Sequence, residues 1–225
     1  IQHSEMFPLV DQNKGNPLEA FQVWLNLPKV SKMVDPHFKM LWHEDIPVIN
    51  HKDEANRTTT IEVIAGKINT INALAPTPDS WAANSNNAVG VFTVKMEADA
   101  QWTLPKTSSN ANRSVFFYKG SSIKIEGQTI ATNHVIELEA GENVTVQNGN
   151  AEAYFLILEG NPIGEPVAQH GPFVMNTQQE IREAMSDYGK TQFGGWPWGE
   201  KEVVHSREKG RFASHSNGKE EIKNN

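Results

Sequence analysis

Residues 114–120 read Ser-Val-Phe-Phe-Tyr-Lys-Gly and belong to a series of short, apolar-rich runs between residues 58 and 159. The other runs cover residues 60–66, 89–96, 122–125, 134–138, 143–147 and 153–159. Glycines separate the runs at fairly regular intervals, at Gly66, Gly120, Gly127, Gly141 and Gly149. Such runs between turn residues are typical of an all-β barrel or sandwich. We therefore predict a β-barrel here, interrupted by an exposed loop at residues 73–88, which are rich in Ala, Pro, Ser and Asn.

Two candidate metal ligands, His3 and Glu5, stand close together at the start of the chain. In an extended strand alternate side chains point to the same face, so this imidazole and this carboxylate would lie a few ångströms apart. The two groups suit a divalent first-row metal, and open coordination positions beside them would allow oxygen chemistry on iron. From spacing alone such a pair is usually two solvated residues on a strand or loop, and two ligands do not complete a metal site.

The segment between this pair and the barrel contains one strand-like stretch. Residues 20–28 alternate apolar and polar side chains and end at Pro28, which predicts a half-buried strand near His3 and Glu5. Residues 29–47 are interrupted by prolines and are expected to connect two domains. Three histidines of this region share no face and are interpreted as surface or locally hydrogen-bonded residues: His37, His43 and His51.

One helix is predicted near the C-terminus. Thr177 and Glu180 have the spacing of a capping box, and Gly189 suits a C-terminal stop. Ile181, Met185 and Tyr188 share one helical face, and this narrow stripe predicts a helix on the surface of a barrel. From residue 199 onward the chain is polar and charged, and we expect disorder there.

Two further blocks of sequence flank this helix. His170-Gly171-Pro172-Phe173 predicts a tight turn between barrel and helix, and its histidine is interpreted as structural. Trp196-Pro197-Trp198 holds two aromatic rings around a rigid proline. This second block could cover a seam between domains or bind a ligand, and we favour the seam.

The composition excludes several classes of protein. The 225 residues are 38% hydrophobic and 21% charged, with no apolar run long enough to cross a bilayer, so a membrane protein is not expected. The net charge of -7 opposes direct attachment to nucleic acid, which depends on Lys and Arg neutralising phosphates. The absence of cysteine excludes disulfides, thiolate nucleophiles and cysteine-based zinc sites. The expected location is the cytoplasm, or also the nucleus if the source is a eukaryote.

Three separated blocks resemble the pirin family of two-barrel cupins. They are His3-Ser4-Glu5-Met6-Phe7-Pro8 with residues 21–28, then residues 164–176, and then Phe193-Gly194-Gly195-Trp196-Pro197. The resemblance implies an all-β bicupin, made of double-stranded β-helix (jelly-roll) barrels, with one C-terminal surface helix. In pirins the iron is held by a His-x-His pair together with a His and a Glu. Only the latter two occur here, as His3 and Glu5, so we expect a chain that lacks the N-terminal part of the first barrel.

The resemblance also divides the chain. Residues 1–50 are expected to be a remnant of the first barrel with its connection, residues 51–162 the C-terminal barrel, residues 163–198 the helix region and residues 199–225 the disordered tail. Ala140-Gly141-Glu142 resembles the acidic turn of a cupin hairpin. Residues 100–105 stand where a metal cupin carries its His-x-His but contain no histidine, so we expect no metal in the second barrel and a structural role for His134.

The functions that the resemblance implies fall into three classes. The first is a quercetin 2,3-dioxygenase-type oxygenase that uses Fe(II) or another divalent first-row metal. His3 and Glu5 would be half of its ligands, Glu5 would also act on the substrate hydroxyl proton, and this chain alone is expected to be inactive. The second is a metal- or redox-responsive regulator that binds transcription factors or other proteins, and the third is a bicupin without metal. The implied partners are a flavonol-like molecule or a protein.

Overall fold

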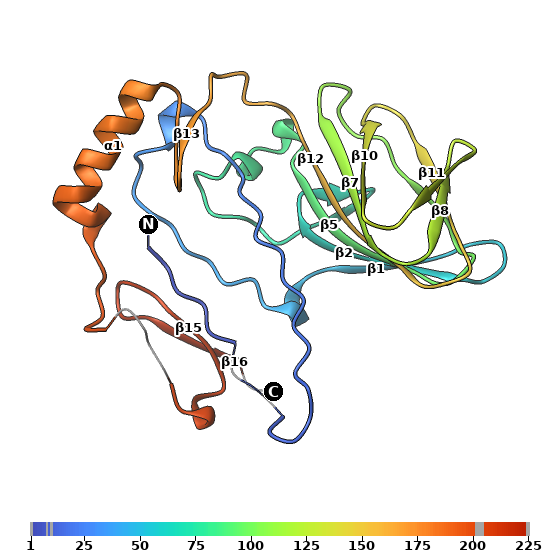
Figure 1. Ribbon diagram of the computed structural model, residues 1–225, viewed down its shortest axis with the longest axis horizontal. Coiled ribbons are helices and arrows are strands. Elements are labelled where there is room, and N and C mark those ends of the chain that lie inside the picture. Colours follow the sequence, from blue (N-terminus) through green and yellow to red (C-terminus); the bar gives the residue numbers. More distant parts are fainter. Residues whose placement is uncertain (1, 8, 10, 201–204, 224–225) are drawn as a thin grey trace. The chain divides into compact units, whose positions relative to one another are not determined.

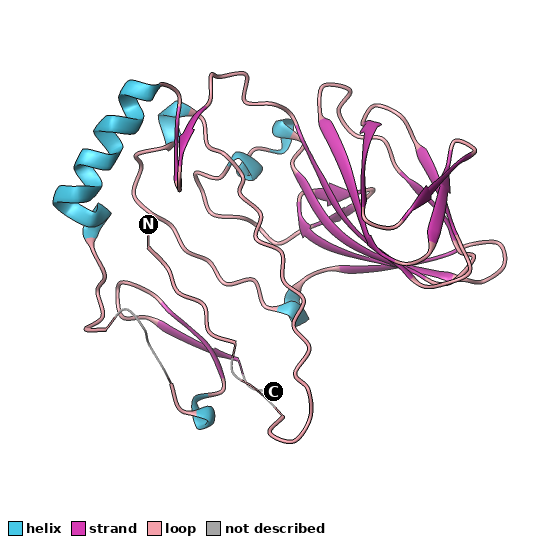
Figure 2. Cartoon of the chain, in the orientation of Figure 1, coloured by secondary structure: helices cyan, strands magenta, loops and turns pink. Residues whose placement is uncertain are grey.

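The computed structural model describes residues 2–7, 9, 11–200 and 205–223. The chain forms two compact units, each with its own internal contacts. Leu41–Gly164 is called the barrel unit here, and Ile1–Met40 together with Glu165–Asn225 is called the terminal unit. Figures 1 and 2 show that strands make up most of the barrel unit, whereas the long helix lies in the terminal unit. Among the described residues no helix is long and apolar enough to span a bilayer.

The barrel unit consists of two antiparallel sheets. Its larger sheet has the order β1-β2-β5-β12-β7-β10 and its smaller sheet the order β6-β11-β8-β9. The strands are β1 (Val48–Lys52), β2 (Thr58–Ala65), β5 (Gly90–Met96), β6 (Gln101–Leu104), β7 (Asn112–Lys119), β8 (Ser122–Ile125), β9 (Gln128–Ala131), β10 (His134–Glu139), β11 (Val144–Asn148) and β12 (Ala153–Gly160). The short strands β3 (Lys67–Ile68) and β4 (Ile71–Asn72) form a separate hairpin, and 3-10 turns lie at His43–Asp45 (η2), Trp81–Ala83 (η3) and Ser85–Asn87 (η4).

Alternation of side chains along the strands builds the core of this barrel. In β5 and β7 every second residue is buried, and these residues fill the space between the two sheets. Phe155 of β12 lies opposite Val94 and Phe117, and its ring stacks on that of Phe117 with the centroids 5.1 Å apart. The all-β prediction is therefore confirmed, and from β5 to β8 the chain passes back and forth between the sheets, as in a double-stranded β-helix.

Two expectations about this unit need correction. The loop at residues 73–88 is only partly exposed, because it contains η3 and η4 and the Trp81 indole Nε1 donates to the Asn161 carbonyl at 2.8 Å. The strand β1 crosses the domain boundary that was expected at residue 50, since it pairs with β2 along its whole length.

A buried ion pair lies within the larger sheet. Arg113 of β7 and Glu159 of β12 are register partners, and Nε of the arginine donates to Oε2 of the glutamate at 2.8 Å. The Arg113 side chain is 0% exposed and that of Glu159 5% exposed. The guanidinium also donates to the carbonyl of Pro105, which follows β6, at 2.8 Å. It donates at 3.4 Å to the carbonyl of Glu142, which precedes β11. Five donors in a rigid fork allow one arginine to satisfy all three acceptors.

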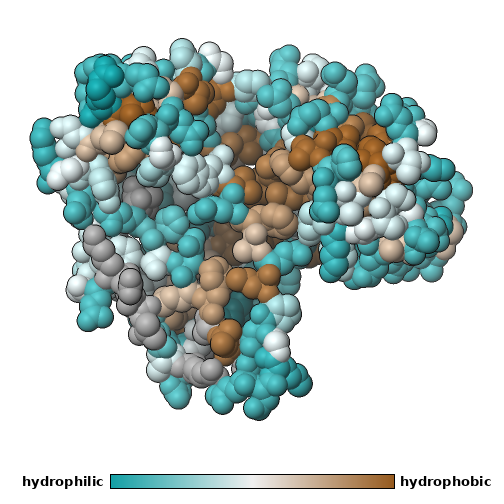
Figure 3. All heavy atoms as spheres, in the orientation of Figure 1, coloured by the Kyte–Doolittle hydropathy of each residue, from teal (hydrophilic) through white to brown (hydrophobic). Residues whose placement is uncertain are grey.

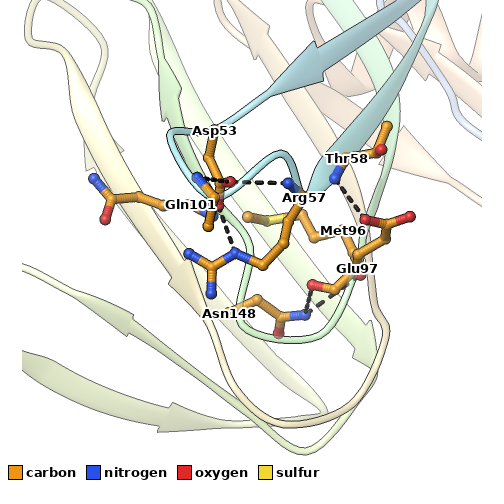
Figure 4. A network of polar contacts seen from close by, with 8 residues as sticks. Asp53, Arg57, Thr58, Met96, Glu97, Gln101 and Asn148 are labelled. Atoms are coloured by element: carbon orange, nitrogen blue, oxygen red, sulfur yellow. Dashed lines mark hydrogen bonds and ion pairs between the residues drawn. The ribbon is translucent and has the colours of Figure 1, made fainter.

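The turn between β1 and β2 is organised by one carboxylate. Figure 4 shows Asp53 accepting from the Arg57 side chain at 2.8 Å and from the backbone N–H groups of Arg57 at 2.9 Å and Gln101 at 3.1 Å. Nearby, the buried Asn148 amide donates to the Glu97 carbonyl at 2.8 Å. Burial alone would raise the pKa of the Asp53 carboxyl, but the hydrogen bonds from Arg57 and Gln101 together lower that pKa below its ordinary value.

This shift predicts a pH-dependent effect of Asp53→Asn. A carboxyl whose pKa is lower in the folded state stabilises the fold above its unfolded pKa, and that contribution is lost as the pH falls through the folded pKa. The variant should therefore unfold at a lower temperature than the wild type at pH 7, and the difference should shrink towards pH 3. Thermal unfolding across this pH range measures it. Asp99→Asn, at an exposed aspartate with φ +59° in the same unit, is the matched control. An equal difference in unfolding temperature between Asp53→Asn and the wild type at pH 7 and at pH 3 would contradict the prediction.

The terminal unit contains the predicted helix. Its elements are η1 (Lys29–Ser31), β13 (Ala168–His170), β14 (Phe173–Met175), α1 (Gln178–Thr191), η5 (Gln192–Gly194), η6 (Arg207–Lys209), β15 (Arg211–Ser214) and β16 (Glu220–Lys223). The capping box of Thr177 and Glu180 is confirmed in both directions. The helix passes the expected stop at Gly189 and ends at Thr191, where Gln192 adopts the left-handed conformation. Its buried residues are Ile181 and Ala184, whereas Met185, expected on the buried face, is 42% exposed.

Two predictions for the terminal unit are wrong. Residues 20–28 lie outside every strand that the structure assigns, and Trp24 is 59% exposed. An alternating pattern favours a strand, but a strand also needs a hydrogen-bonded neighbour. In the expected disordered tail, β15 and β16 form an antiparallel hairpin around Asn217-Gly218, with Gly218 at φ +82°. The Asn-Gly pair is the sequence signal that could have revealed this hairpin. Residues 201–204, 224 and 225 of that tail lie outside the described residues.

Candidate functional site

The two candidate ligands are neighbours in the structure. His3 Nε2 lies 3.2 Å from Glu5 Oε1, and the side chains are 55% and 60% exposed, so both groups are accessible to a solute. The described residues around them belong to no strand, which differs from the extended strand assumed in the sequence analysis. Their closeness nevertheless agrees with the prediction from their spacing.

The separation of these two atoms fits two positions of one metal ion. Neighbouring ligand atoms around an octahedral ion with bonds of about 2.1 Å lie roughly 3 Å apart. An imidazole nitrogen and a carboxylate oxygen are also the donor types that a first-row divalent metal accepts. Within the described ranges, however, no group of three or more His, Cys, Asp or Glu side chains is arranged to hold a metal. His3 and Glu5 are therefore a pair of donors rather than a complete site.

The residue before His3 is attached to helix α1. The Gln2 side-chain amide donates to the Gln192 carbonyl at 3.1 Å and to the Tyr188 hydroxyl at 3.4 Å. All of these residues belong to the terminal unit. This connection was not predictable from sequence, because nothing in the pattern around Gln2 relates it to a helix 186 residues away.

The remaining histidines of interest have local roles. His134 begins β10, and its Nδ1 lies 2.9 Å from the Ala131 carbonyl and 3.1 Å from the Thr132 carbonyl, which agrees with the structural role predicted for it. His43 lies 3.7 Å from Glu62 and His51 lies in β1. His170-Gly171-Pro172-Phe173 forms the tight connection of the β13–β14 hairpin, with Gly171 at φ +54°, so the predicted turn is confirmed.

The barrel interior is apolar where a metal cupin would carry its histidines. Trp102 and Leu104 of β6 are buried in the core cluster, opposite Val146 and Val144 of β11. A small polar pocket of about 130 Å³ lies at one end of β2 and β5 and is lined by Thr58, Thr60, Lys95, Glu97 and Glu152. Its carboxylates already have partners, because Glu152 pairs with Lys95 at 2.7 Å and Glu97 accepts from the Thr58 N–H at 2.6 Å.

Comparison with known proteins relates part of this chain to the pirin family. Residues 91–194 match the pirin C-terminal cupin domain. Residues 91–194 belong to the pirin family. A pirin-like protein of Solanum lycopersicum is 33% identical over 196 residues, which cover 86% of this chain and 62% of that protein. Pirin-1 of Arabidopsis thaliana is 33% identical over 198 residues, which again cover 86% of this chain and 62% of the relative.

The structural comparison agrees with the pirin match. The chain is similar to the crystal structure of quercetin 2,3-dioxygenase from Acinetobacter baumannii, with a TM-score of 0.63 and 27% sequence identity over 76% of this chain and 55% of that one. The cupin fold expected from the resemblance is thus confirmed. The chain spans less than two thirds of the length of these pirin relatives.

Proposed function

We propose that this pirin-type chain contributes to a metal-dependent oxygenase of the quercetin 2,3-dioxygenase type, with a flavonol-like small molecule as substrate. The observation that carries the proposal is the 3.2 Å approach of His3 Nε2 to Glu5 Oε1 on an accessible surface. The name of the similar Acinetobacter baumannii structure supports the same reaction class. Fe(II), or another divalent first-row metal, is the cofactor that this donor set suits.

His3 and Glu5 would hold two positions of the metal. The described residues bring no third ligand to them, so the proposal requires further ligands from outside the described ranges. When bound, the metal would supply a Lewis acid that polarises the oxygen atoms of the substrate. His3 would offer its Nε2 as a neutral donor, and Glu5 would accept the substrate hydroxyl proton on a carboxylate oxygen that is not committed to the metal.

The experiment compares metal content and oxygen uptake across variants. Wild type, His3→Ala and Glu5→Gln are loaded with Fe(II) under anaerobic conditions, and bound metal is measured by elemental analysis before quercetin and oxygen are added. We expect His3→Ala to bind Fe(II) at least about tenfold more weakly, because removing a ligand should cost more affinity than the roughly 10–100-fold lost with a supporting residue. At limiting Fe(II) its metal content should therefore fall clearly below that of the wild type. Glu5→Gln should lose metal less severely and oxygen uptake more severely.

The control is His134→Ala, which removes an exposed histidine whose ring contacts local carbonyls in the barrel unit. It should bind metal as the wild type does. Metal binding that survives His3→Ala unchanged would refute the assignment of His3. Wild type that binds no iron would refute the metal-dependent proposal for this chain.

A second candidate function is binding to other proteins as a metal-responsive regulator. Several large apolar side chains are exposed in the N-terminal part of the terminal unit, and an interaction surface would need such side chains. They include Phe7, Leu9, Leu18, Trp24, Val30 and Met33, which are 59–84% exposed. In Figure 3 apolar residues are visible on the surface as well as polar ones. Iron binding that depends on His3 but brings no oxygen uptake with quercetin would favour this second candidate.

A further inference from the structure

Three aromatic rings meet beside the end of helix α1. Tyr188 of the helix packs edge-to-face against Phe173 at 5.9 Å and against Phe193 at 5.4 Å between ring centroids, and Phe173 and Phe193 lie 6.3 Å apart. Phe173 comes from the β13–β14 hairpin and Phe193 from the segment after the helix. Edge-to-face packing of this kind restricts ring orientation. The three rings, called the aromatic cluster here, therefore hold the Tyr188 hydroxyl in a defined place.

The backbone beyond the helix is held in an unusual conformation. Gln192 and Phe193 are consecutive non-glycine residues with φ +48° and +50°, in the left-handed region. The Gln192 N–H donates to the Tyr188 carbonyl, and the Phe193 N–H donates to the Thr191 hydroxyl at 3.1 Å. Such conformations persist only where the surroundings impose them. Here they place the Gln192 carbonyl where it accepts from the Gln2 side chain.

The other end of the helix is also tied to the N-terminal part of the chain. Lys29 Nζ pairs with Oε1 of Glu180, the capping-box residue, at 2.6 Å. The Lys29 backbone N–H donates to Glu165 at 2.7 Å, and the Asn176 amide donates to the same Glu165 oxygen at 2.8 Å. Both ends of α1 thus contact residues 2–29, so the helix can serve as a fixed reference for that segment.

We propose that the C-terminal end of α1 positions the His3–Glu5 pair, with Gln2, Tyr188 and Gln192 as positioning residues. One Gln2 amide group reaches two acceptors, at 3.1 and 3.4 Å, and the peptide that follows it carries His3. A donor pair on an otherwise irregular segment needs such support, because metal affinity depends on ligands that are already oriented. This proposal rests on the proposed function, which gives His3 and Glu5 their role as metal ligands. The attachment of Gln2 to the end of α1 can be measured without metal.

The test removes the attachment while preserving shape. Gln2→Met has a similar length but cannot donate, and Tyr188→Phe keeps the ring in the aromatic cluster but lacks the hydroxyl. Backbone ¹⁵N order parameters of residues 3–7 are measured in the metal-free protein. We expect those of Gln2→Met to fall from near the rigid value of about 0.85 to below about 0.6, with a smaller fall for Tyr188→Phe. The order parameters of α1 should not change in Gln2→Met.

The matched control is Tyr154→Phe, which removes a hydroxyl that donates to Glu152 at 3.1 Å in the barrel unit. It should leave residues 3–7 as ordered as in the wild type. A second measurement follows broadening of the Ser4 and Glu5 amide signals by added Mn(II). The Mn(II) concentration for half-broadening should rise roughly fivefold in Gln2→Met, the factor that corresponds to about one net hydrogen bond.

The two measurements separate two failures. Unchanged order parameters in Gln2→Met would overturn the positioning role, whatever the metal does. Lower order parameters in Gln2→Met, together with no Mn(II) broadening in the wild type, would support the attachment and overturn the proposed metal function of His3 and Glu5. If Tyr188→Phe loosens the helix itself, Gln2→Met still decides, because Gln2 lies outside α1.

Discussion

Replacing Arg113 by methionine should destabilise the barrel unit by about 3–5 kcal/mol at pH 7, the typical cost of removing one partner from a buried ion pair. The substitution leaves the Glu159 carboxylate 5% exposed without its cation. It also leaves the Pro105 and Glu142 carbonyls without the guanidinium that links them to β7. Urea unfolding monitored by circular dichroism measures the loss.

The same variant should show a characteristic pH dependence. Burial raises the pKa of the Glu159 carboxyl even though Arg113 opposes that shift, so without Arg113 the folded pKa should rise further. A carboxyl with a raised folded pKa favours the fold below its unfolded pKa, near 4.3, and this contribution is lost as the pH rises through the folded pKa. The loss of unfolding free energy in Arg113→Met, relative to the wild type, should therefore be smallest near pH 4 and larger at pH 8.

A double variant provides the control for this pair. Arg113→Met with Glu159→Leu removes both charges, and replacing a whole buried pair with apolar residues is often neutral or stabilising. The double variant should thus recover most of the stability lost by the single one. A double variant as unstable as Arg113→Met would show that the two lost hydrogen bonds to the Pro105 and Glu142 carbonyls, rather than the uncompensated charge, dominate the loss.

The second large effect is expected for Gly66→Ala, between β2 and β3. Gly66 has φ +82°, and a Cβ added there would lie 1.9 Å from the Val89 carbonyl oxygen. The left-handed conformation costs a non-glycine residue about 1–2 kcal/mol, and forcing atoms into a packed region costs about 1–3 kcal/mol more. We expect a loss of about 3–5 kcal/mol in the free energy of unfolding, because the obstacle is backbone rather than a flexible side chain.

Gly127→Ala is the matched control, because Gly127 has a similar φ of +75° but nothing within 4 Å of an added Cβ. This variant should lose only the conformational part, about 1–2 kcal/mol. Equal losses at the two glycines would contradict the steric explanation. Comparison of the two denaturation midpoints therefore isolates the contribution of the close approach to Val89.

The features that were predictable from sequence are those with a local cause. Alternating burial along residues 89–96 and 114–120 reproduces β5 and β7 closely, because the strand period of two is already present in the order of the side chains. The capping box at Thr177 and Glu180 likewise depends on residues three positions apart. The closeness of His3 and Glu5 follows from the same kind of short-range spacing.

Features that depend on distant partners could not be predicted in this way. Residues 20–28 have the alternation of a strand, yet the described structure assigns them to none, whereas the polar residues 211–223 form a hairpin. Neither outcome follows from apolar content, because pairing depends on which backbone segment lies alongside. The Asn217-Gly218 turn is the local signal that favours the hairpin, whereas the polar composition of the segment favours disorder.

The sequence by itself determined the all-β class, the order of the strand runs, the start of α1 and the two donor residues at the N-terminus, since each depends on neighbours in the chain. Only the tertiary structure decided that Arg113 meets Glu159 across 46 positions and that Gln2 meets Tyr188 across 186. Those contacts depend on how folded elements approach one another. Hydrogen bonds and ion pairs across such separations leave no periodic pattern in the sequence, so their partners become visible only after the chain has folded.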